Sequence, residues 1–586
     1  MMMNKESENL LAKKRHSLAH LLAAAVMELY PDAKRTIGPA IDNGFYYDFD
    51  DLKISDSDLP KIEAKMIQIL PTWESFEKSE LTREEALAQY PNNPYKAELI
   101  EEFSEGGKKT ISFYRSGVFS DLCKGGHVEN MSEIDPKSFK LSHIAGAYWK
   151  GDEKNAMLTR IYGLAFDTAK ELEEYEKMME EAKKRDHRKI GQEQELFFID
   201  EMVGKGLIMW LPKGNIIKGE IEKMALRLEE KAGYKRVTTP HIAKEELFLT
   251  SGHLPYYKED MYPPMEMDDG TYYLKAMNCP HHHRIYTHSP KSYRDLPLRI
   301  SEYGTVYRNE RSGALAGLLR VRGLDMNDAH IYCRKDQIKD EFKLVMEMTI
   351  SYFKLFGLED YWFRLSKWDP TKTDKYFNDP KSWAYAEGEI RSVLEEMKVK
   401  FIEADDEAAF YGPKVDVMFK SVLGREEAMS TIQLDFIAKE KFDLTFTDKD
   451  GKENKDVFVI HRAPLSTHER FMAFLIEHYA GAFPLWLSPV QVKILPVAES
   501  HREYGEQIEE ALREHGIRAE LDRTDETLGK KVRNAKIEKV PYWVVIGDNE
   551  ISSEKMTLES REGEKQSELD MEHLTGALLK EISEKT

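Results

Sequence analysis

The sequence has little cysteine, no long apolar run and no excess of positive charge, and each shortage excludes a class of protein. Only three of the 586 residues are cysteine (Cys123, Cys279 and Cys333), which is typical of the reducing cytosol and not of disulfide-stabilised secreted domains. No stretch of about 18 uncharged apolar residues occurs, so a transmembrane helix is not expected. The first 20 residues carry early acidic side chains and no apolar segment before a cleavage site, unlike a secretory signal. These features predict a cytoplasmic protein.

The formal net charge of −20 argues against nonspecific nucleic-acid binding over the whole surface. A local basic patch remains open, because "GKKVRNAKIEK" (529–539) holds five Lys or Arg against one Glu. Taken alone, such a stretch is more often a solvated helix face than a binding site. With 41% apolar and 32% charged residues, the chain has the composition of a globular protein of two to four domains.

Composition and periodicity divide the chain into blocks and predict an α+β multidomain fold. Residues 1–166 mix a helical start with strand-like pieces such as "GFYYDFD", and residues 167–191 are almost entirely helix-forming and highly charged, as in an exposed connecting helix. Residues 192–488 mix long amphipathic helices with β-branched and aromatic runs. Residues 489–586 alternate strand and helix, which predicts a small α/β domain with a mostly parallel sheet.

Two pairs of potential ligands share a four-residue spacing in the first block. "HSLAH" places His16 and His20 on one helix face, and "DLCKGGH" repeats the spacing with Cys123 and His127, beside Asp121. Three imidazoles and a thiol suit a zinc site, and they suit equally a metal-free hydrolytic pocket with imidazoles as acid and base groups. The helix lacks the glutamate of "HExxH" metalloproteases, which disfavours a protease.

A second constellation lies in "SEYGTVYRNERSGALAGLLRVRGLDMNDAHIYC" (301–333), which predicts a strand, an arginine, an acid, a Gly-rich loop and a returning strand with further arginines. Arginines that flank a loop suit a triphosphate, because the guanidinium fork matches phosphate oxygens. As composition alone this is a moderate signal, since arginines near glycine lie on surface loops more often than not.

A third stretch, "KAMNCPHHHR" (275–284), places Cys279 one residue from three consecutive histidines, His281, His282 and His283. Thiolate and imidazole are the ligands that zinc prefers. The local density suggests a metal site, but the stretch by itself does not identify which side chains would hold the metal.

Three segments of the first block resemble the editing domain of threonyl-tRNA synthetases: "HSLAHLLAAAVMELYPDAKRTIGPAIDNGFYYDFD", "DLCKGGHVEN" and "GAYWKGDEKNAMLTRIYG". The resemblance implies an editing domain over residues 1–166 that hydrolyses wrongly made seryl-tRNA(Thr). In that family the pocket is thought to work without metal, whereas the related alanyl editing domain carries similar residues and can hold zinc, so the metal question stays open. The implied editing residues are His16, His20, Tyr47, Lys96, Asp121, Cys123 and His127.

In the middle block, "YRNE" resembles motif 2 of class II aminoacyl-tRNA synthetases. Motif 1, the dimer element, corresponds to "EKMALRLEEKAGYKRVTTPHI", and motif 3 to "STHERFMAFLIEHY". The resemblance implies a catalytic domain over residues 192–488, built on an antiparallel sheet flanked by helices, that binds ATP with Mg²⁺. It assigns Arg308 to the α-phosphate and the amino-acid carboxylate, Glu310 to the adenine end and Arg470 to the γ-phosphate, with Arg320 a further candidate on the returning strand.

The same resemblance implies one zinc ion per subunit, held by Cys279 in "MNCP", His330 in "DAHI" and His461 in "HRA". Three ligands from separate strands or loops leave a fourth position open, as in working zinc sites. No family motif includes His281, His282 or His283, and at least two of them are expected to be ordinary loop residues. The implied substrate-binding residues are Asp328, for the threonine hydroxyl, Tyr411, for the amino group, and Lys414, Gln433 and Thr467.

An open zinc position explains why a second, hydrolytic site is needed. Threonine can offer its amino group and hydroxyl together, whereas valine lacks the hydroxyl, and a site built for a hydroxyl rejects such an analogue by ~10⁴-fold or more. Serine loses only a methyl group, worth about 1–3 kcal/mol, and is poorly discriminated. The two candidate sites therefore support each other.

The last block resembles the anticodon-binding domain shared by threonyl, prolyl, histidyl and glycyl synthetases. The resemblance implies an anticodon-binding domain over residues 489–586, a phosphate contact at 529–539, and Glu550 and Asp525 at the anticodon. Several positions depart from the family. Met326 and Ala428 stand where Gln is common, Thr467 where Ser is usual, and Glu559 where an Arg is expected. The small ubiquitin-like domain with which the family usually begins has no counterpart in this sequence.

The resemblance thus implies ATP-dependent ligation of L-threonine to tRNA(Thr) through threonyl-adenylate, with editing, by a homodimer formed through motif 1. Its partners are tRNA(Thr), ATP and L-threonine, with no membrane. One alternative is a synthetase-derived RNA-binding or regulatory protein without amino-acid activation, which retention of the motif arginines and zinc ligands disfavours. Another is a synthetase for a different amino acid, which the combination of zinc ligands and editing pocket disfavours.

Overall fold

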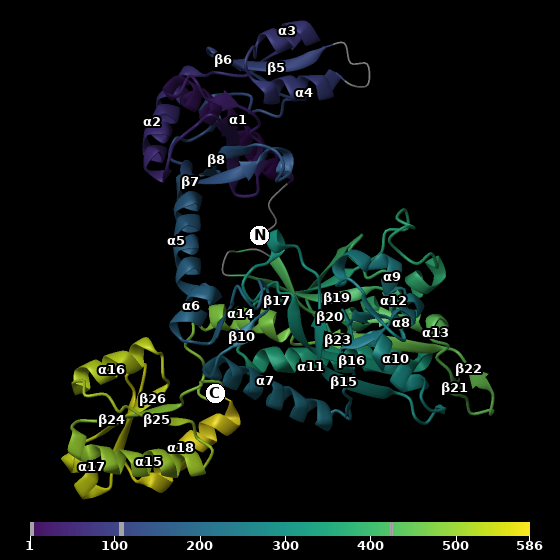
Figure 1. The fold of residues 1–586 in the computed structure, drawn as a ribbon, viewed down its shortest axis with the longest axis vertical. Coiled ribbons are helices and arrows are strands. Elements are labelled where there is room, and N and C mark those ends of the chain that lie inside the picture. Colours follow the sequence, from purple (N-terminus) through teal and green to yellow (C-terminus); the bar gives the residue numbers. More distant parts are fainter. Residues whose placement is uncertain (1–4, 105–109, 422–423, 425, 586) are drawn as a thin grey trace. The chain divides into compact units, whose positions relative to one another are not determined.

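The computed structural model describes residues 5–104, 110–421, 424 and 426–585. The chain forms two compact units, Met1–Glu180 and Glu181–Thr586 (Figure 1). Among the helices of the described residues, none is both long and apolar enough to cross a membrane. Each unit has its own apolar core.

The first unit is built on a long helix that covers a small antiparallel sheet. Helix α1 (Lys5–Leu29) is rich in Leu and Ala, which are strong helix formers, and its second half packs with α2 (Leu59–Ile69) into one core. The sheet order is β1-β3-β8-β7, with β2 paired to β3. Its strands are β1 (Lys34–Arg35), β2 (Ala40–Ile41), β3 (Gly44–Asp50), β7 (Phe139–Tyr148) and β8 (Met157–Ala165).

A second, three-stranded sheet completes this unit. Strands β4 (Glu77–Leu81), β5 (Ile111–Ser116) and β6 (Phe119–Leu122) are antiparallel neighbours. Helices α3 (Arg83–Ala88) and α4 (Pro94–Ser104) share an apolar cluster with β5 and β6. This arrangement places residues of α4 and β6 within one polar network, described below.

The helix predicted over residues 167–191 is in fact two helices, α5 (Ala169–Arg185) and α6 (His187–Glu193). The side chain of Asp186 accepts a hydrogen bond from the backbone N–H of Arg188, which caps a new helix at this point. Gly191, the last residue of the predicted helix, is not a helix end. It lies inside α6, where an added Cβ would fall 2.3 Å from the Phe197 ring.

The second unit contains an eight-stranded sheet of order β11-β15-β16-β23-β20-β19-β17-β18, which is antiparallel apart from the β11–β15 and β17–β18 pairs at its edges. This is the antiparallel sheet with flanking helices that was predicted. The strands are β11 (Lys235–Arg236), β15 (Leu298–Tyr307), β16 (Gly323–Arg334), β17 (Tyr361–Ser366), β18 (Phe401–Ala404), β19 (Lys414–Lys420), β20 (Glu426–Asp435) and β23 (Val457–Ala463).

Alternation along the central strands divides this sheet into an apolar face and a polar face. Ile331, Ile460, Ile432 and Val415 belong to the core formed with four helices, and the residues next to them point the other way. The helices are α7 (Pro212–Lys231), α11 (Ile338–Leu355), α12 (Pro380–Glu396) and α14 (His468–His478). Helical packing on one face leaves the polar face available for a site.

Smaller elements accompany the eight-stranded sheet of the second unit. They comprise a three-stranded sheet, β12 (Ile242–Lys244), β13 (Met265–Met267) and β14 (Gly270–Leu274), and two hairpins, β9 (Phe197–Phe198) with β10 (Met209–Trp210) and β21 (Phe446–Thr447) with β22 (Glu453–Asn454). The short helices are α8 (Glu245–Ser251), α9 (His253–Tyr256), α10 (Cys279–Thr287) and α13 (Ala438–Lys441).

The C-terminal region has a mixed sheet of order β25-β24-β26-β27-β28. Only β24, β25 and β26 are parallel, so the prediction of a mostly parallel sheet was too simple; the last two strands form an antiparallel hairpin. The strands are β24 (Val492–Pro496), β25 (Ala519–Leu521), β26 (Tyr542–Ile546), β27 (Met556–Ser560) and β28 (Lys565–Leu569), and the helices α15 (Arg502–Glu514), α16 (Leu528–Ile537), α17 (Asp548–Ser553) and α18 (Met571–Glu584).

Candidate functional site

A cavity of about 680 Å³ lies over the polar face of the eight-stranded sheet. Its lining draws on β16, β19, β20 and β23, together with residues of α10 and α14. Every site residue predicted for the catalytic domain lines it: Cys279, Arg308, Glu310, Arg320, Asp328, His330, Tyr411, Lys414, Gln433, His461, Thr467 and Arg470. The structure therefore brings residues from distant parts of the sequence to one place.

Strand register explains how four of these residues meet. Lys414 pairs with Gln433, Gln433 with His461, and His461 with His330, across β19, β20, β23 and β16. Directly opposed residues of antiparallel strands point to the same face of a sheet. The four side chains therefore form one row across the floor of the cavity.

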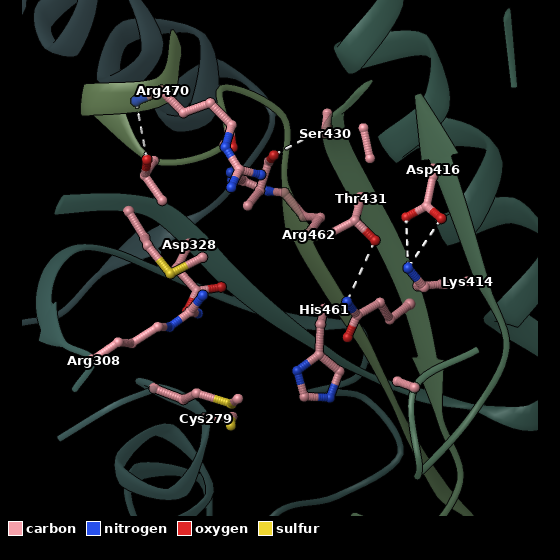
Figure 2. A pocket seen from close by; sticks show the side chains of 18 of the residues that line it. Cys279, Arg308, Asp328, Lys414, Asp416, Ser430, Thr431, His461, Arg462 and Arg470 are labelled. Atoms are coloured by element: carbon pink, nitrogen blue, oxygen red, sulfur yellow. Dashed lines mark hydrogen bonds and ion pairs between the residues drawn. The ribbon is translucent and has the colours of Figure 1, made fainter. Parts of the chain in front are cut away.

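Cys279, His330 and His461 form a compact three-ligand cluster. One ligand atom from each lies within 4.8 Å of the others, and all three residues are buried. Figure 2 shows Cys279 and His461 turned toward the same space, with Asp328 and Arg308 beside it. A sulfur and two imidazole nitrogens at this separation fit a tetrahedral zinc site with one position open. Cys279 comes from the first turn of α10, not from the strand or loop that was predicted.

Polar neighbours orient the two histidines of this cluster. His461 Nε2 lies 3.1 Å from the Asp435 carboxylate, and its ring stacks on Tyr411 with 5.1 Å between centroids. His330 Nδ1 lies 2.8 Å from His282 Nδ1. Burial, reinforced by the negative charges of Asp328 and Asp435, raises the pKa of the Cys279 thiol well above its usual value. A bound cation would offset this effect, so the site is electrostatically suited to one.

The expectation that the consecutive histidines are ordinary loop residues was wrong. His281, His282 and His283 all lie on α10 and are buried, the most exposed at 7%. His282 also contacts Glu302, and His283 Nδ1 lies 3.0 Å from the Tyr332 hydroxyl. None of the three belongs to the three-ligand cluster.

Arg308, Arg320 and Arg470 bring three positive charges to the lining of the cavity. Burial and the nearby charges of Arg308 and Arg320 together lower the pKa of Arg470, although Glu427 acts against them. Arg308 Nε is buried without a hydrogen-bond partner. Mutual repulsion and an unpaired donor both favour an anionic ligand here. Arg320 lies in the loop that precedes β16, not on the returning strand as predicted, and pairs with Glu310 at 2.8 Å.

The remaining predicted residues are held in place by hydrogen bonds and ion pairs to their neighbours. Asn278 Nδ2 donates to Asp328 at 3.1 Å, and the Tyr411 hydroxyl donates to Gln433. Lys414 Nζ lies 3.0 Å from Asp416. Thr467 caps α14 by accepting the Arg470 N–H at 3.2 Å, a role that the usual Ser would also fill. Met326 and Ala428, where Gln is common, both line the cavity.

A second cluster in the first unit contains all four residues of the paired motifs. Ligand atoms of His16, His20, Cys123 and His127 lie within 4.8 Å of one another. His16 Nε2 is 3.0 Å and His127 Nε2 is 3.4 Å from the Cys123 sulfur. The two histidines of α1 are thus brought to the segment that follows β6.

Asp121 is the centre of a buried network beside this cluster. Lys96 Nζ lies 2.8 Å from its carboxylate, and the hydroxyls of Tyr47 and Tyr90 donate to it at 2.5 and 2.6 Å. Burial alone would raise the pKa of Asp121, but Lys96 and Arg35 hold it well below its usual value. Neither Tyr90 nor Arg35 was among the predicted editing residues: Tyr90 lies outside the segments that carry the resemblance, and Arg35 lies within the first of them.

These environments keep the cluster neutral. Burial raises the pKa of the Cys123 thiol to about 11, and burial together with His16 lowers the pKa of His127 to about 3. Near neutral pH the thiol is therefore protonated and His127 is a free base. Such a site suits proton transfer to and from water better than attack by a thiolate.

The residues predicted for the anticodon lie apart from both clusters in sequence, on the C-terminal region. Glu550, on α17, accepts the Gly547 N–H at 2.9 Å, and Asp525 is an exposed partner of Arg502. Glu559 faces Lys565 on the neighbouring strand, 3.1 Å away, so the altered charge at this position has a local partner. Nothing in the structure tests the anticodon assignment of Glu550 and Asp525, which stays a prediction.

Three family models match the chain. The tRNA synthetase class II core domain (G, H, P, S and T) matches residues 262–479, the anticodon binding domain residues 491–581, and the threonyl and alanyl tRNA synthetase second additional domain residues 111–162.

Curated relatives and solved structures agree with these matches. A threonine–tRNA ligase of Anoxybacillus flavithermus is 48% identical over 97% of this chain and 88% of its own length. One of Staphylococcus carnosus is 48% identical over 98% of this chain and 89% of its own length. A structure of the RNA binding domain of threonyl-tRNA synthetase from Cryptosporidium parvum has a TM-score of 0.63 at 33% identity, covering 68% of this chain and 98% of the other.

Glu469, near the start of α14, yields a pH prediction. It is buried and accepts the Asp325 N–H at 3.1 Å, and burial and the Asp325 charge raise its pKa to about 7. The folded state then keeps a proton that the unfolded state loses above about pH 4.5, so this group destabilises the fold as pH rises from 4.5 to 7.

We expect Glu469→Gln, which copies the protonated carboxyl, to match the unsubstituted protein at pH 4 and to be more stable at pH 8 by about 3 kcal/mol. Thermal unfolding midpoints at the two pH values measure this, with the exposed Glu440→Gln as control. Equal pH dependence of the unsubstituted protein and the Glu469 variant would contradict the assignment.

Proposed function

The chain belongs to the threonyl-tRNA synthetase family, and on this premise we propose how its residues divide the work. It is a class II threonine–tRNA ligase with an editing domain. ATP, L-threonine and tRNA are therefore its substrates. The proposed location is the cytoplasm, where its substrates occur together.

We propose that Cys279, His330 and His461 hold a zinc ion. An ion held there would supply Lewis-acid recognition of the amino group and the hydroxyl of threonine. Asp328, two residues before His330 on the same face of β16, accepts the threonine hydroxyl. Tyr411, whose ring stacks on His461, faces the amino group, and its hydrogen bond to Gln433 fixes its direction.

The arginines act on ATP, which binds with Mg²⁺. A carboxylate oxygen of threonine attacks the α-phosphorus, a new O–P bond forms, and pyrophosphate leaves with the electrons of the broken bond. Arg308 contacts the carboxylate and α-phosphate, while Arg470 contacts the γ-phosphate and stabilises the leaving group. Glu310, held by Arg320, receives the adenine amine. Positioning and charge neutralisation supply most of the rate, because no proton transfer is needed.

The observation that carries this proposal is the shared cavity, in which the three-ligand cluster and the arginines face the same space. A hydroxyl-binding cluster next to an anion site selects a small hydroxylated amino acid and activates it. Serine meets the same requirements and differs only by a methyl group, so activation alone discriminates it poorly.

ATP–pyrophosphate exchange tests the synthetic site. We expect exchange with threonine, weaker exchange with serine, and exchange with valine lower than with threonine by ~10⁴-fold in kcat/KM. Cys279→Ala should lose bound zinc and most threonine exchange, whereas Cys333→Ala, at a buried core cysteine outside the cluster, should keep its zinc. Absence of exchange with threonine would contradict the function, and strong exchange with valine would contradict the zinc role.

We propose that the first unit hydrolyses seryl-tRNA. A histidine of the cluster takes a proton from water, the water oxygen attacks the ester carbonyl, and the proton passes to the departing ribose oxygen. The neutral imidazoles of His16 and His127 suit this exchange of protons. Lys96 and Tyr47 are buried against Asp121, and their role is to hold this carboxylate beside the cluster.

Deacylation of preformed seryl-tRNA(Thr) tests the editing proposal. His127→Ala should slow deacylation by about 10²–10⁴-fold, the usual contribution of general acid–base catalysis, and seryl-tRNA should accumulate during charging. Threonine activation should be unchanged, since His127 lies in the other unit. The exposed His143→Ala, on β7 of the same unit, serves as control. Unchanged deacylation by the His127 variant would overturn the assignment.

We propose that the chain forms a homodimer through motif 1, residues 222–242, together with the hairpin β9–β10, which precedes it in the chain. The hairpin β9–β10, which leads into α7, carries large apolar side chains at the surface: Phe198, Ile199, Met202, Val203 and Met209. Met202 is 97% exposed, and several apolar side chains together at the surface typically mark a protein interface.

Sedimentation equilibrium measures the assembly. We expect a species of twice 68.0 kDa for the unsubstituted chain. The double substitution Met202→Asp and Val203→Asp should weaken the dimer by at least tenfold, because two charges would be buried in an apolar contact. Leu344→Asp, at a half-exposed residue of α11, should leave it intact. A monomeric unsubstituted chain at micromolar concentration would contradict the proposal.

A further inference from the structure

His282 and His330 meet through like atoms, which restricts where their protons lie. Their Nδ1 atoms are 2.8 Å apart, so one of the two must carry the hydrogen and the other must accept it. A neutral imidazole has a single N–H. If His330 presents Nε2 to a metal, its proton is on Nδ1 and points at His282.

The tautomer of His282 is then fixed as well. Because its Nδ1 accepts from His330, its own proton is on Nε2. That nitrogen lies 3.1 Å from Glu302 Oε2. Glu302, His282 and His330 then form one directed chain of hydrogen bonds that ends at His330 Nε2. Both nitrogens of His282 are occupied, which agrees with its absence from the ligand cluster.

Glu302 is anchored as a carboxylate. Its oxygens accept from the Thr239 N–H at 2.7 Å and the Thr239 hydroxyl at 2.9 Å, and Lys275 Nζ lies 3.7 Å away. Lys275 in turn donates to the Thr239 hydroxyl at 2.9 Å. All these side chains are at most 6% exposed. Burial would raise the pKa of Glu302, but His282, Thr239 and Lys275 lower it to about 2.

We propose that Glu302 and His282 are positioning residues that fix His330 in the tautomer and orientation required of a zinc ligand. Many metal sites place a carboxylate or carbonyl directly on the ligating histidine. His461 has this arrangement with Asp435. For His330 an interposed histidine extends the reach of the carboxylate. The inference rests on the proposed zinc site and adds the residues that hold one of its ligands.

The hydrogen-bonded chain Glu302–His282–His330, hereafter the relay, gives the middle member of the run of three histidines a role. The members of this run are separated by their partners: His282 faces His330, His283 faces Tyr332, and both ring nitrogens of His281 are buried without a partner. Only the middle histidine hydrogen-bonds to a proposed ligand, whereas the His283 ring packs edge-on against His330 and His461. His281 is therefore a matched control, one residue away on the same helix and outside the relay.

Zinc retention in the purified full-length protein tests the inference. We expect His282→Leu to weaken zinc binding by about 10–100-fold, measured by transfer to a chromophoric chelator, as for other residues that support metal ligands. His282→Asn, whose side-chain oxygen can still accept from His330, should recover part of this loss. Glu302→Gln should fall between the unsubstituted protein and His282→Leu. His281→Leu should hold zinc like the unsubstituted protein.

Two further measurements separate positioning from general damage to the fold. The visible spectrum of the cobalt-substituted protein reports ligand geometry and should change in His282→Leu and not in His281→Leu. In ATP–pyrophosphate exchange, His282→Leu should raise KM for threonine and leave KM for ATP unchanged, since the arginines are untouched. If His282→Leu fails to fold, the same measurements on His282→Asn and Glu302→Gln still test the inference.

The outcomes distinguish the two proposals. An unsubstituted protein that holds no zinc overturns the zinc site, and the relay with it. An unsubstituted protein that holds zinc, together with His282 and Glu302 variants of equal zinc affinity and unaltered cobalt spectrum, overturns the relay alone. Equal losses in the His281 and His282 variants would show that the effect is one of packing in α10.

Discussion

The synthetic site depends on the register of the central strands. Opposing His330 to His461 and His461 to Gln433 places the proposed ligands and a substrate contact on one face, while Ile331 and Ile460 enter the core behind it. A slip of one residue would turn every side chain of a strand to the other face. The apolar core therefore disfavours such a slip, because it would bury imidazoles among the helices and expose isoleucines.

The two clusters are built from the same kinds of side chain, cysteine and histidine, in different numbers and surroundings. In the second unit a thiol and two imidazoles leave one position open, which suits recognition of an amino group and a hydroxyl together. In the first unit three imidazoles surround a thiol, with a buried lysine–aspartate pair beside them. An open metal position can select amino acids that carry a hydroxyl over those that lack one. The methyl group that distinguishes threonine from serine changes the free energy of binding by only about 1–3 kcal/mol. That limit is the physical reason for a hydrolytic site in the same chain.

Much of the site could be predicted because its residues stand within recognisable motifs. Cys279, His330, His461 and the arginines lie in the short stretches that carry the family resemblance, and all of them line one cavity. Motifs do not report local geometry, so Arg320 was wrongly placed on a strand, and the antiparallel end of the C-terminal sheet was missed. Supporting residues such as Glu302, Asp435 and Tyr90 carry no motif. They are single polar residues whose partners lie far along the chain, and only the fold identifies them.

The histidine run on α10 shows why proximity in sequence misleads about chemistry. Adjacent residues of a helix point about 100° apart, so three consecutive side chains cannot converge on one ion. Convergence requires separate elements, here the start of α10, β16 and β23. A helix can instead supply one metal ligand from its first turn. The residue three positions later lies next to it on the helix surface and can hydrogen-bond to a ligand that belongs to another element. Cys279 and His282 have this spacing, and a single turn of helix thus supplies both a proposed ligand and the residue that orients another.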